Sequence, residues 1–480
     1  MMKGLYLLFI CMVVNTSGFA QKKISLIDSL CKTYNHIDVL NGVVLVAEDN
    51  NITYNKAFGK ANFEWSVNNT PATKFKIASI SKPFTAVIVL QLCQEGKMNL
   101  EGKLSDYLPA YPQGGKIAIY QLLTHTSGII DTRDVKNFDQ SYGMRHLTRD
   151  GLLAVFKDSA LLFQPGKNFY YSSFNYNLLA IIIEKITGKN FKDVLKERIF
   201  NIAGMLNTAT TDDIEIKSGY ANGYEINYAA INSAQYFDAS ATVGSGSIVT
   251  TALDLLSFFK ALKTGRLLNA VYTKMFFTPS GTDNNGVKTG FSSWYFNLNL
   301  NDKDSTGVAY YAGGHFGVNT LVYDSYEKNK MIIILLNVKT QRMFEVGDNI
   351  LNIIYNLHFD WPKDAYARLF AQDIKGHGIP YAVQKFKERK IKYSNLYTQK
   401  PRDLNRLGYY YLDNNEISTA VEIFKLNLLY YPNEGDFYDS LGEGYMLLGD
   451  KEKATINLKK AIEIDPSNNH AKELLSKLLN

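Results

Sequence analysis

A repeat with a period of 34 residues near the C-terminus, visible in the step from Gly408 to Gly442, is the feature that most constrains how this chain can fold. Small residues at fixed points of such a repeat let two helices approach closely, and a proline ends each second helix. The positions that recur at this spacing are Gly408/Gly442, Tyr411/Tyr445, Ala420/Ala454, Leu428/Ile462 and Pro432/Pro466. Two unrelated amphipathic helix pairs would rarely share so many positions at one period, so residues 404–467 are predicted to form two successive helix pairs.

This segment resembles the tetratricopeptide repeat, in which helix pairs stack on one another. Residues 469–478 are expected to form a capping helix behind it. Two repeats are fewer than a free-standing solenoid usually needs, and residues 364–392, with helical spacing of their apolar side chains, are a plausible degenerate extra pair. Such a module would bind a peptide or protein partner or pack against its own chain, and it would carry no chemistry itself.

The N-terminus predicts a secretory signal peptide over residues 1–20. Lys3 precedes the apolar run 5–14, and small residues stand at Gly18 and Ala20, the positions −3 and −1 of a cut after Ala20. The apolar run is about half of the roughly 20 residues that a membrane-spanning helix needs, which disfavours a membrane anchor. The mature chain is therefore expected outside the cytoplasm, periplasmic or secreted, with no transmembrane segment.

Composition excludes several classes of function. The 480 residues carry a mild formal charge of +6 with no dense stripe of Lys and Arg, so no nucleic-acid partner is expected. The chain has 3 cysteines, too few for a disulfide framework or a four-thiolate zinc site. Cys31 and Cys93 would remain in the mature chain, either as one disulfide or as two inert buried thiols.

Residues 21–360 are predicted to form one α+β domain, followed by a helical connector at 361–403 and by the repeats at 404–480. β-rich runs occur at both ends of this domain, whereas the middle has mainly helical spacing. Strands are expected at residues 39–47, 52–58, 294–300, 308–312, 320–324 and 331–337, and helices at 81–95, 176–186, 191–200, 252–262 and 343–357. This arrangement indicates an antiparallel sheet that joins the two ends of the domain.

A serine and a lysine three residues apart open the most apolar of these helices. After Pro83 the sequence is apolar almost all round, which predicts a buried helix, and the spacing places Ser79 and Lys82 on one face. Burial would lower the pKa of the lysine from about 10.4, so that a neutral amine could accept the serine proton. The same spacing occurs at 29–32, 257–260 and 325–328, so it indicates a nucleophile only together with companion motifs.

Four further segments supply those companions. They are LLTHTSGI at 122–129, in which His125 is expected to be structural, the segment 165–173 with Tyr171, the Gly- and Ser-rich run 244–247, and GGHFG at 313–317. With Ser79 and Lys82 they resemble the penicillin-recognising serine hydrolases of the class C β-lactamase type, over about residues 38–357. That family includes β-lactamases, DD-carboxypeptidases, D-aminopeptidases and carboxylesterases. The resemblance implies the β-lactamase/DD-peptidase fold and a hydrolase that requires neither a metal nor an organic cofactor.

The resemblance also implies roles for individual residues. Ser79 would be the nucleophile and Lys82 its base or proton relay. Tyr171 would match the tyrosine of the family's Tyr-x-Asn motif, which passes a proton between the serine and the leaving group. The segment 315–317 would match the Lys/His-x-Gly strand motif that lines the pocket, and the backbone N–H groups of Ser79 and Val318 would form the oxyanion hole.

Two departures from the family's motifs concern substrate binding. Ser173 stands where β-lactam-specialised members have an asparagine, and His315, only partly charged near neutral pH, stands where they have a lysine. Ser173, His315 and Gly317 are therefore candidate substrate-binding residues. We expect an ester, amide or D-amino-acid peptide to be cleaved through a covalent acyl-enzyme, with weak classical β-lactamase activity. The alternative is a non-catalytic, penicillin-binding-like secreted protein whose repeats hold a peptide or protein partner.

Overall fold

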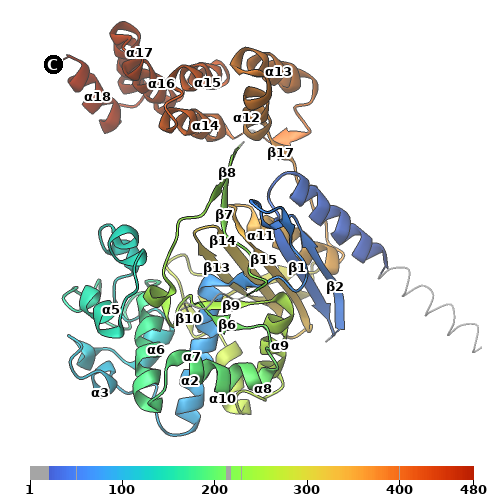
Figure 1. Ribbon diagram of the computed structural model, residues 1–480, viewed down its shortest axis with the longest axis vertical. Coiled ribbons are helices and arrows are strands. Elements are labelled where there is room, and N and C mark those ends of the chain that lie inside the picture. The colour runs from blue at the N-terminus through green and yellow to red at the C-terminus, as the bar shows by residue number, and fades with distance from the viewer. Residues whose placement is uncertain (1–20, 50, 212–217, 229, 399, 480) are drawn as a thin grey trace, which may run out of the picture. The chain divides into compact units, whose positions relative to one another are not determined.

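The computed structural model describes residues 21–479 except 50, 212–217, 229 and 399. The described residues divide into two compact units, one within Met1–Glu225 and Ser233–Asp360 and the other within Ile226–Asn232 and Trp361–Asn480 (Figure 1). The expected signal peptide lies outside the described residues. Within the described ranges no helix has both the length and the apolar character to cross a membrane.

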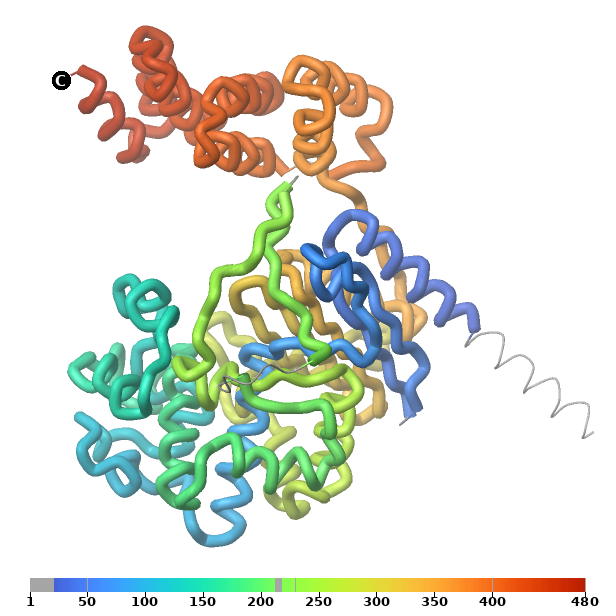
Figure 2. Tube along the Cα trace, viewed as in Figure 1, coloured from blue at the N-terminus to red at the C-terminus, as the bar shows by residue number. Residues whose placement is uncertain are grey.

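The first unit is built on an eight-stranded antiparallel sheet with the order β10-β11-β12-β13-β14-β15-β1-β2. Its strands are β1 (Gly42–Glu48), β2 (Asn51–Phe58), β10 (Gly281–Thr282), β11 (Lys288–Thr289), β12 (Trp294–Asn299), β13 (Ser305–His315), β14 (Val318–Ser325) and β15 (Lys330–Leu336). β1 pairs with β15 along its whole length, from Gly42 opposite Leu336 to Glu48 opposite Lys330. The prediction that the sheet joins both ends of the domain is confirmed, and Figure 2 shows the blue first strands beside the gold last ones.

Both faces of the central strands are covered, which explains why their sequences are continuously apolar. Successive side chains of a strand point to opposite faces, and on β1 Val43 and Val44 are both fully buried. Val43 belongs to the core that includes the middle helices. On a sheet face, α11 (Met343–Ile354) packs against β14 and β15. The hydroxyl of Tyr34, in the helical stretch 21–36, donates to Glu345 of α11 at 3.0 Å.

Helices fill the middle of this unit. They are α2 (Lys82–Gln94), α3 (Leu104–Tyr107), α4 (Ile119–Leu123), α5 (Arg149–Phe156), α6 (Ser173–Thr187), α7 (Phe191–Leu195), α8 (Asn201–Ala203), α9 (Ala252–Lys263) and α10 (Ala270–Phe277). α2 is buried from Lys82 to Leu92, as its apolar sequence predicts. Phe84 of α2 stacks on Phe258 of α9 with ring centroids 3.8 Å apart. α2 is therefore a rigid central element on which a reactive group can be held.

A three-stranded sheet, with the order β5-β9-β6, brings the chain to the start of α2. Its strands are β5 (Phe75–Lys76), β6 (Ala209–Thr210) and β9 (Ile248–Thr250). The remaining short strands are β3 (Lys60–Asn62), β4 (Val67–Asn68), β7 (Tyr224–Asn227), β8 (Ala230–Ser233) and β16 (Val338–Lys339). β3 and β4 pair only with each other, in a two-stranded sheet of their own.

The sequence left open whether Cys31 and Cys93 form a disulfide or remain two thiols. In the structure both are free thiols. Burial raises the pKa of the Cys31 thiol to about 12 and that of Cys93 to about 11. Thiols held in this protonated form are poor nucleophiles, and neither is a candidate for covalent catalysis.

The second unit consists mainly of helices that pack in succession. They are α12 (Tyr366–His377), α13 (Ile379–Lys392), α14 (Pro401–Asp413), α15 (Ile417–Tyr430), α16 (Gly435–Leu447), α17 (Lys451–Ile464) and α18 (Asn469–Leu479), with β17 (Asp364–Ala365) paired to β18 (Tyr397–Thr398). The two repeated glycines lie at equivalent close approaches. A Cβ on Gly408 would lie 2.1 Å from the ring of Phe424, and one on Gly442 would lie 2.7 Å from the side chain of Leu458. The prediction of a helical C-terminal region is confirmed.

Candidate active site

Ser79 lies in a 3₁₀ turn, Ala78–Ser81, that connects β5 to α2. The residue before it, Ala78, has φ of 45°. This left-handed conformation is uncommon for a residue with a Cβ and costs about 1–3 kcal/mol. The sequence predicted Ser79 within the first turn of a helix, whereas the structure places it just before α2, in a tight turn that directs its side chain into a cavity.

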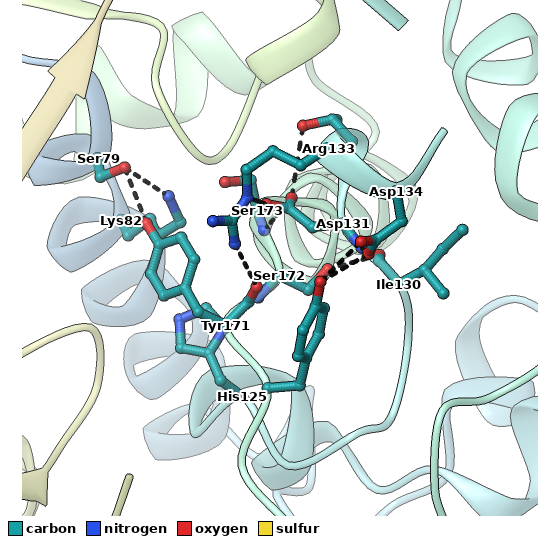
Figure 3. A network of polar contacts seen from close by, with 12 residues as sticks. Ser79, Lys82, His125, Ile130, Asp131, Arg133, Asp134, Tyr171, Ser172 and Ser173 are labelled. Atoms are coloured by element: carbon teal, nitrogen blue, oxygen red, sulfur yellow. Dashed lines mark hydrogen bonds and ion pairs between the residues drawn. The ribbon is translucent and has the colours of Figure 1, made fainter. Parts of the chain in front are cut away.

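Two side chains meet the hydroxyl of Ser79 (Figure 3). The Nζ of Lys82 lies 3.0 Å from the Ser79 Oγ, and the hydroxyl of Tyr171 lies 2.8 Å from the same oxygen. Lys82 is fully buried, and its Nζ also donates to the carbonyl of Ser245 at 3.1 Å, so the Gly- and Ser-rich run 244–247 reaches the site through its backbone. The structure thus brings together the three residues that the sequence singled out for chemistry.

His125 holds the segment that carries Tyr171. The imidazole is 2% exposed, and its Nδ1 accepts the backbone N–H of Ser172 at 3.2 Å. The Nε2 lies 3.3 Å from the hydroxyl of Ser292. Burial, and then the charge of Lys82, hold the pKa of His125 well below its usual value. Because the ring is neutral and Nδ1 accepts, the proton resides on Nε2.

Asp131 and Arg133 form a second support for the same segment. The carboxylate of Asp131 is buried and accepts the backbone N–H of Ser173 at 2.9 Å and the Nε of Arg133 at 2.8 Å. The Nη2 of Arg133 donates to the carbonyl of Tyr171 at 3.3 Å (Figure 3). Sequence reasoning missed this pair, and the only signal for it was its position directly after the LLTHTSGI segment.

A cavity of about 120 Å³ opens beside Ser79. Its walls include Ser173, His315 and Val318, three residues that the sequence placed at the site. Gly317 is absent from these walls, and a Cβ there would lie 2.5 Å from both the Cβ of Ala234 and the backbone nitrogen of Tyr224. The expectation that Gly317 contacts substrate is therefore corrected: it is a turn residue with φ of 64°, packed against a neighbouring segment.

The register of β13 and β14 also corrects the expected oxyanion hole. Phe316 and Gly317 form a two-residue turn, with His315 opposite Val318. Residues that close such a hairpin exchange backbone hydrogen bonds, so the N–H of Val318 points toward His315. Backbone groups alternate along a strand, so the N–H of Gly314 points away from β14, and Gly314 lines the cavity. The N–H that accompanies Ser79 at this edge is that of Gly314 and not that of Val318.

Gly313 explains how β13 comes so close to the nucleophile. A Cβ at this position would lie 2.3 Å from the carbonyl oxygen of Ile77 and 3.1 Å from the backbone nitrogen of Ser79. The hydroxyl of Thr320, opposite Gly313 on β14, donates to the same Ile77 carbonyl at 3.0 Å. The strand residue that lies against the Ser79 turn is thus Gly313, and residues 315–317 are the end of the strand and its turn.

His315 is neutral at physiological pH, which corrects the expectation of partial charge. Burial, followed by the charges of Lys76, Lys339 and Lys82, lowers its pKa to about 4. Its ring packs against Phe237 with centroids 4.3 Å apart. His315 therefore presents an uncharged imidazole to the cavity, where a lysine would present an ammonium group.

No cluster of three or more His, Cys, Asp or Glu side chains that could hold a metal ion is found in the part of the chain that the structure describes. The site consists of a serine, an amine, a phenol and backbone N–H groups. Such a set can carry out acyl transfer through a covalent intermediate.

Comparison with known proteins decides the family. The Beta-lactamase family model matches residues 27–355, which is more than half of the chain. The chain belongs to the beta-lactamase family. The match covers the whole eight-stranded sheet and every residue of the site described above, and it ends before the helices α12 to α18.

Family relatives include penicillin-binding-like proteins and a D-alanine hydrolase. The putative penicillin-binding protein PbpX of Bacillus subtilis is 28% identical over 351 residues, 71% of this chain and 82% of its own. The teichoic acid D-alanine hydrolase of Staphylococcus aureus is 27% identical, over 66% of this chain and 74% of its own. The crystal structure of a penicillin binding protein from Bacillus halodurans matches with a TM-score of 0.59 and 25% identity, over 68% of this chain and 99% of its own. This family membership and these relatives support a hydrolase.

Proposed function

We propose that this protein is a serine hydrolase of the β-lactamase/DD-peptidase/esterase type that works through a covalent acyl-enzyme. The observation that carries this proposal is the double contact on one oxygen: Lys82 Nζ and the Tyr171 hydroxyl both lie within hydrogen-bonding distance of the Ser79 Oγ, at 3.0 and 2.8 Å. A binding protein would have no physical need for a fully buried amine within hydrogen-bonding distance of a hydroxyl that lines a cavity, because burying a polar group has a desolvation cost.

The reaction follows from these contacts. The Ser79 Oγ attacks a carbonyl carbon and forms a C–O bond, while its proton passes to Lys82 or Tyr171. The oxygen that becomes negative is held by the backbone N–H groups of Ser79 and Gly314, each worth a few kcal/mol of transition-state stabilisation. The bond to the leaving group then breaks, and Tyr171 returns the proton to that group. Water then attacks the ester carbonyl and gives a proton to Lys82 or Tyr171, the C–O bond to Ser79 breaks, and the Ser79 Oγ takes the proton back as the acid product leaves.

We propose an ester, amide or D-amino-acid peptide as the substrate. One relative is named a teichoic acid D-alanine hydrolase, which favours a D-alanyl acyl group. The site itself disfavours efficient β-lactamase activity, because Ser173 offers no side-chain amide and the neutral His315 offers no cationic charge. Turnover of nitrocefin at diffusion-limited efficiency would contradict this assignment.

A covalent probe tests the proposal. Mature protein treated with a fluorophosphonate is expected to gain one adduct on Ser79 by intact-mass and peptide mass spectrometry, and Ser79→Ala to gain none. Ser29→Ala is the matched control, because Ser29 has the same Ser-x-x-Lys spacing and lies far from Ser79 in the sequence. Lys82→Ala should lower kcat by about 10²–10⁴, the range for a general base, with a smaller effect on the melting temperature. No labelling of the folded protein under any condition would favour the non-catalytic binding protein.

For the second unit we propose a tetratricopeptide-like module that binds a peptide or protein partner. The repeated glycines support it, since Gly408 and Gly442 each lie against a bulky side chain of the following helix. For localisation we propose the extracytoplasmic space, on the sequence pattern of residues 1–20. Mass spectrometry of protein secreted from a bacterial host tests this point, with a new N-terminus at Gln21 as the expected result.

A further inference from the structure

Two lysines line a pair of adjoining cavities, the first of which opens beside Ser79. Lys74 and Lys76 are two residues apart on an extended segment, so their side chains lie on the same face, while Phe75 between them is 1% exposed on the other. Lys76 lines the cavity beside Ser79. It also lines a second cavity, of about 360 Å³, which Lys74 shares.

The two cavities adjoin along a common wall. Besides Lys76, the residues that line both are Thr211, Gln235, Phe316 and Val318. The second cavity has no acidic side chain among the described residues that line it. Lys74 is held in place there, with its Nζ 3.4 Å from the carbonyl of Ser218 and 5.7 Å from the ring centroid of Tyr220. Lys76 therefore lies at the wall shared by two adjoining cavities, one beside Ser79 and one that also contains Lys74, and these two cavities together are called the groove below.

Unlike Lys74, Lys76 has an ammonium group without a fixed partner in this groove. In the described part of the chain, neither a hydrogen bond nor an ion pair holds it, and the Lys76 side chain is exposed. The carboxylate whose charge acts on it, Asp238, already accepts the backbone N–H of Ser240 at 2.9 Å and the hydroxyl of Tyr236 at 3.1 Å. Asp139 lines the first cavity but makes no ion pair with Lys76.

Because the side chain of Lys76 is exposed and has no fixed counter-charge among the described residues, its ammonium group is available to an anionic group of a ligand. The nearby imidazole adds no charge of its own, since burial, followed by the charges of Lys76 and Lys339, lowers the pKa of His315. An incoming anion would therefore meet Lys76 as the first free cation beside Ser79. Building on the function proposed above, we propose that this groove binds an anionic group of the substrate, a phosphate or a carboxylate, with Lys76 as the specificity-determining residue and Lys74 as its second contact.

Matched substrate pairs that differ only in this charge test the proposal. D-alanyl-glycerol 3-phosphate against D-alanyl-glycerol tests the phosphate, and N-acetyl-D-alanyl-D-alanine against its C-terminal amide tests the carboxylate. The enzymes are wild type, Lys76→Met, Lys76→Arg and the control Lys116→Met, an exposed lysine whose Nζ is 3.5 Å from the Gln113 side-chain oxygen. Where neither member of a pair is turned over, both are compared as inhibitors of fluorophosphonate labelling of Ser79.

For the substrate pair whose anion is recognised, Lys76→Met should lower kcat/KM of the charged substrate by about tenfold or more, mainly by raising KM. The same substitution should change kcat/KM of the neutral substrate by less than about twofold. Lys76→Arg should retain most of the preference for the charged over the neutral substrate, and Lys116→Met should retain all of it. Added NaCl should reduce the preference in wild type and have less effect in Lys76→Met. Equal handling of charged and neutral members by wild type, or an unchanged preference in Lys76→Met, would overturn the anion site alone. Absence of both hydrolysis and labelling at Ser79 would instead reject the hydrolase on which it rests.

Discussion

The imidazole ring of His125 lies against the phenol ring of Tyr171, with the two centroids 4.5 Å apart. This contact joins the LLTHTSGI segment to the proton relay of the proposed reaction. His125 itself is too far buried to meet a substrate, and it acts by fixing the backbone at Ser172 and the ring of Tyr171. It is therefore a positioning residue.

Replacing this imidazole should lower turnover without weakening substrate binding. His125→Phe keeps a ring beneath Tyr171 but removes the acceptor for the Ser172 N–H. We expect kcat to fall by about tenfold or more, the cost of about 1.4 kcal/mol in transition-state stabilisation, with KM nearly unchanged. The matched control is His358→Phe, because the His358 side chain is 88% exposed. A rise in KM with unchanged kcat would show that His125 serves substrate binding instead.

His315 should make the protein less stable in weak acid. Its pKa is about 4 in the folded chain and about 6.5 when unfolded. Between these values the unfolded chain binds a proton that the folded chain does not, so stability is complete above pH 6.5 and falls as the pH decreases toward 4, by about 1.4 kcal/mol per pH unit for this group. Urea unfolding at pH 7.0 and 5.0 should show that the free energy of unfolding falls less in His315→Gln than in wild type between these two pH values. His358→Gln should behave as wild type, and equal losses in all three proteins would contradict the prediction.

The sequence predicted the parts of the site that depend on local spacing. Ser79 and Lys82 are three residues apart at the start of an apolar segment, so their proximity followed from helical geometry, even though the serine belongs to the preceding turn. The sheet that joins both ends of the domain followed from the β-rich runs on either side of a helical middle. Tyr171 lies 92 residues from Ser79, and no periodicity could bring it there. Only the resemblance to a family did so.

What the sequence could not supply was the exact register of a hairpin. In GGHFG either half could be strand or turn, and motif matching placed the strand at 315–317. The structure has the turn at Phe316 and Gly317, so the backbone N–H that is not used in pairing β13 with β14 is that of Gly314 and not that of Val318. A shift of this kind is decided by tertiary contacts, here the close approach of Gly313 to Ile77 and Ser79, and short motifs do not encode such contacts. The groove formed by Lys74 and Lys76 was missed for a similar reason, because its other walls come from distant segments.

Gly313 should be required for the site. In Gly313→Ala the new Cβ would lie 2.3 Å from the Ile77 carbonyl oxygen, a backbone atom that cannot yield without moving the Ser79 turn. We expect a loss of about 1–3 kcal/mol in unfolding free energy, as for overpacking, together with a fall in the rate of fluorophosphonate labelling. Gly307→Ala is the matched control on β13, because a Cβ there meets no atom within 4 Å. Normal labelling of the Gly313→Ala protein would contradict the role given to this close approach.

Gly408 and Gly376 should respond in opposite directions to the same substitution. Both lie in helices of the second unit, where alanine is favoured over glycine by about 1 kcal/mol. In Gly376→Ala nothing lies within 4 Å of the new Cβ, so the unit should become slightly more stable. In Gly408→Ala the Cβ would lie 2.1 Å from the buried ring of Phe424, and overpacking of about 1–3 kcal/mol should exceed the helical gain. Thermal unfolding and hydrogen exchange of α14 and α15 would measure this, while labelling at Ser79 should stay unchanged in both variants. Stabilisation by Gly408→Ala would mean that the repeated glycines do not set the spacing between helices.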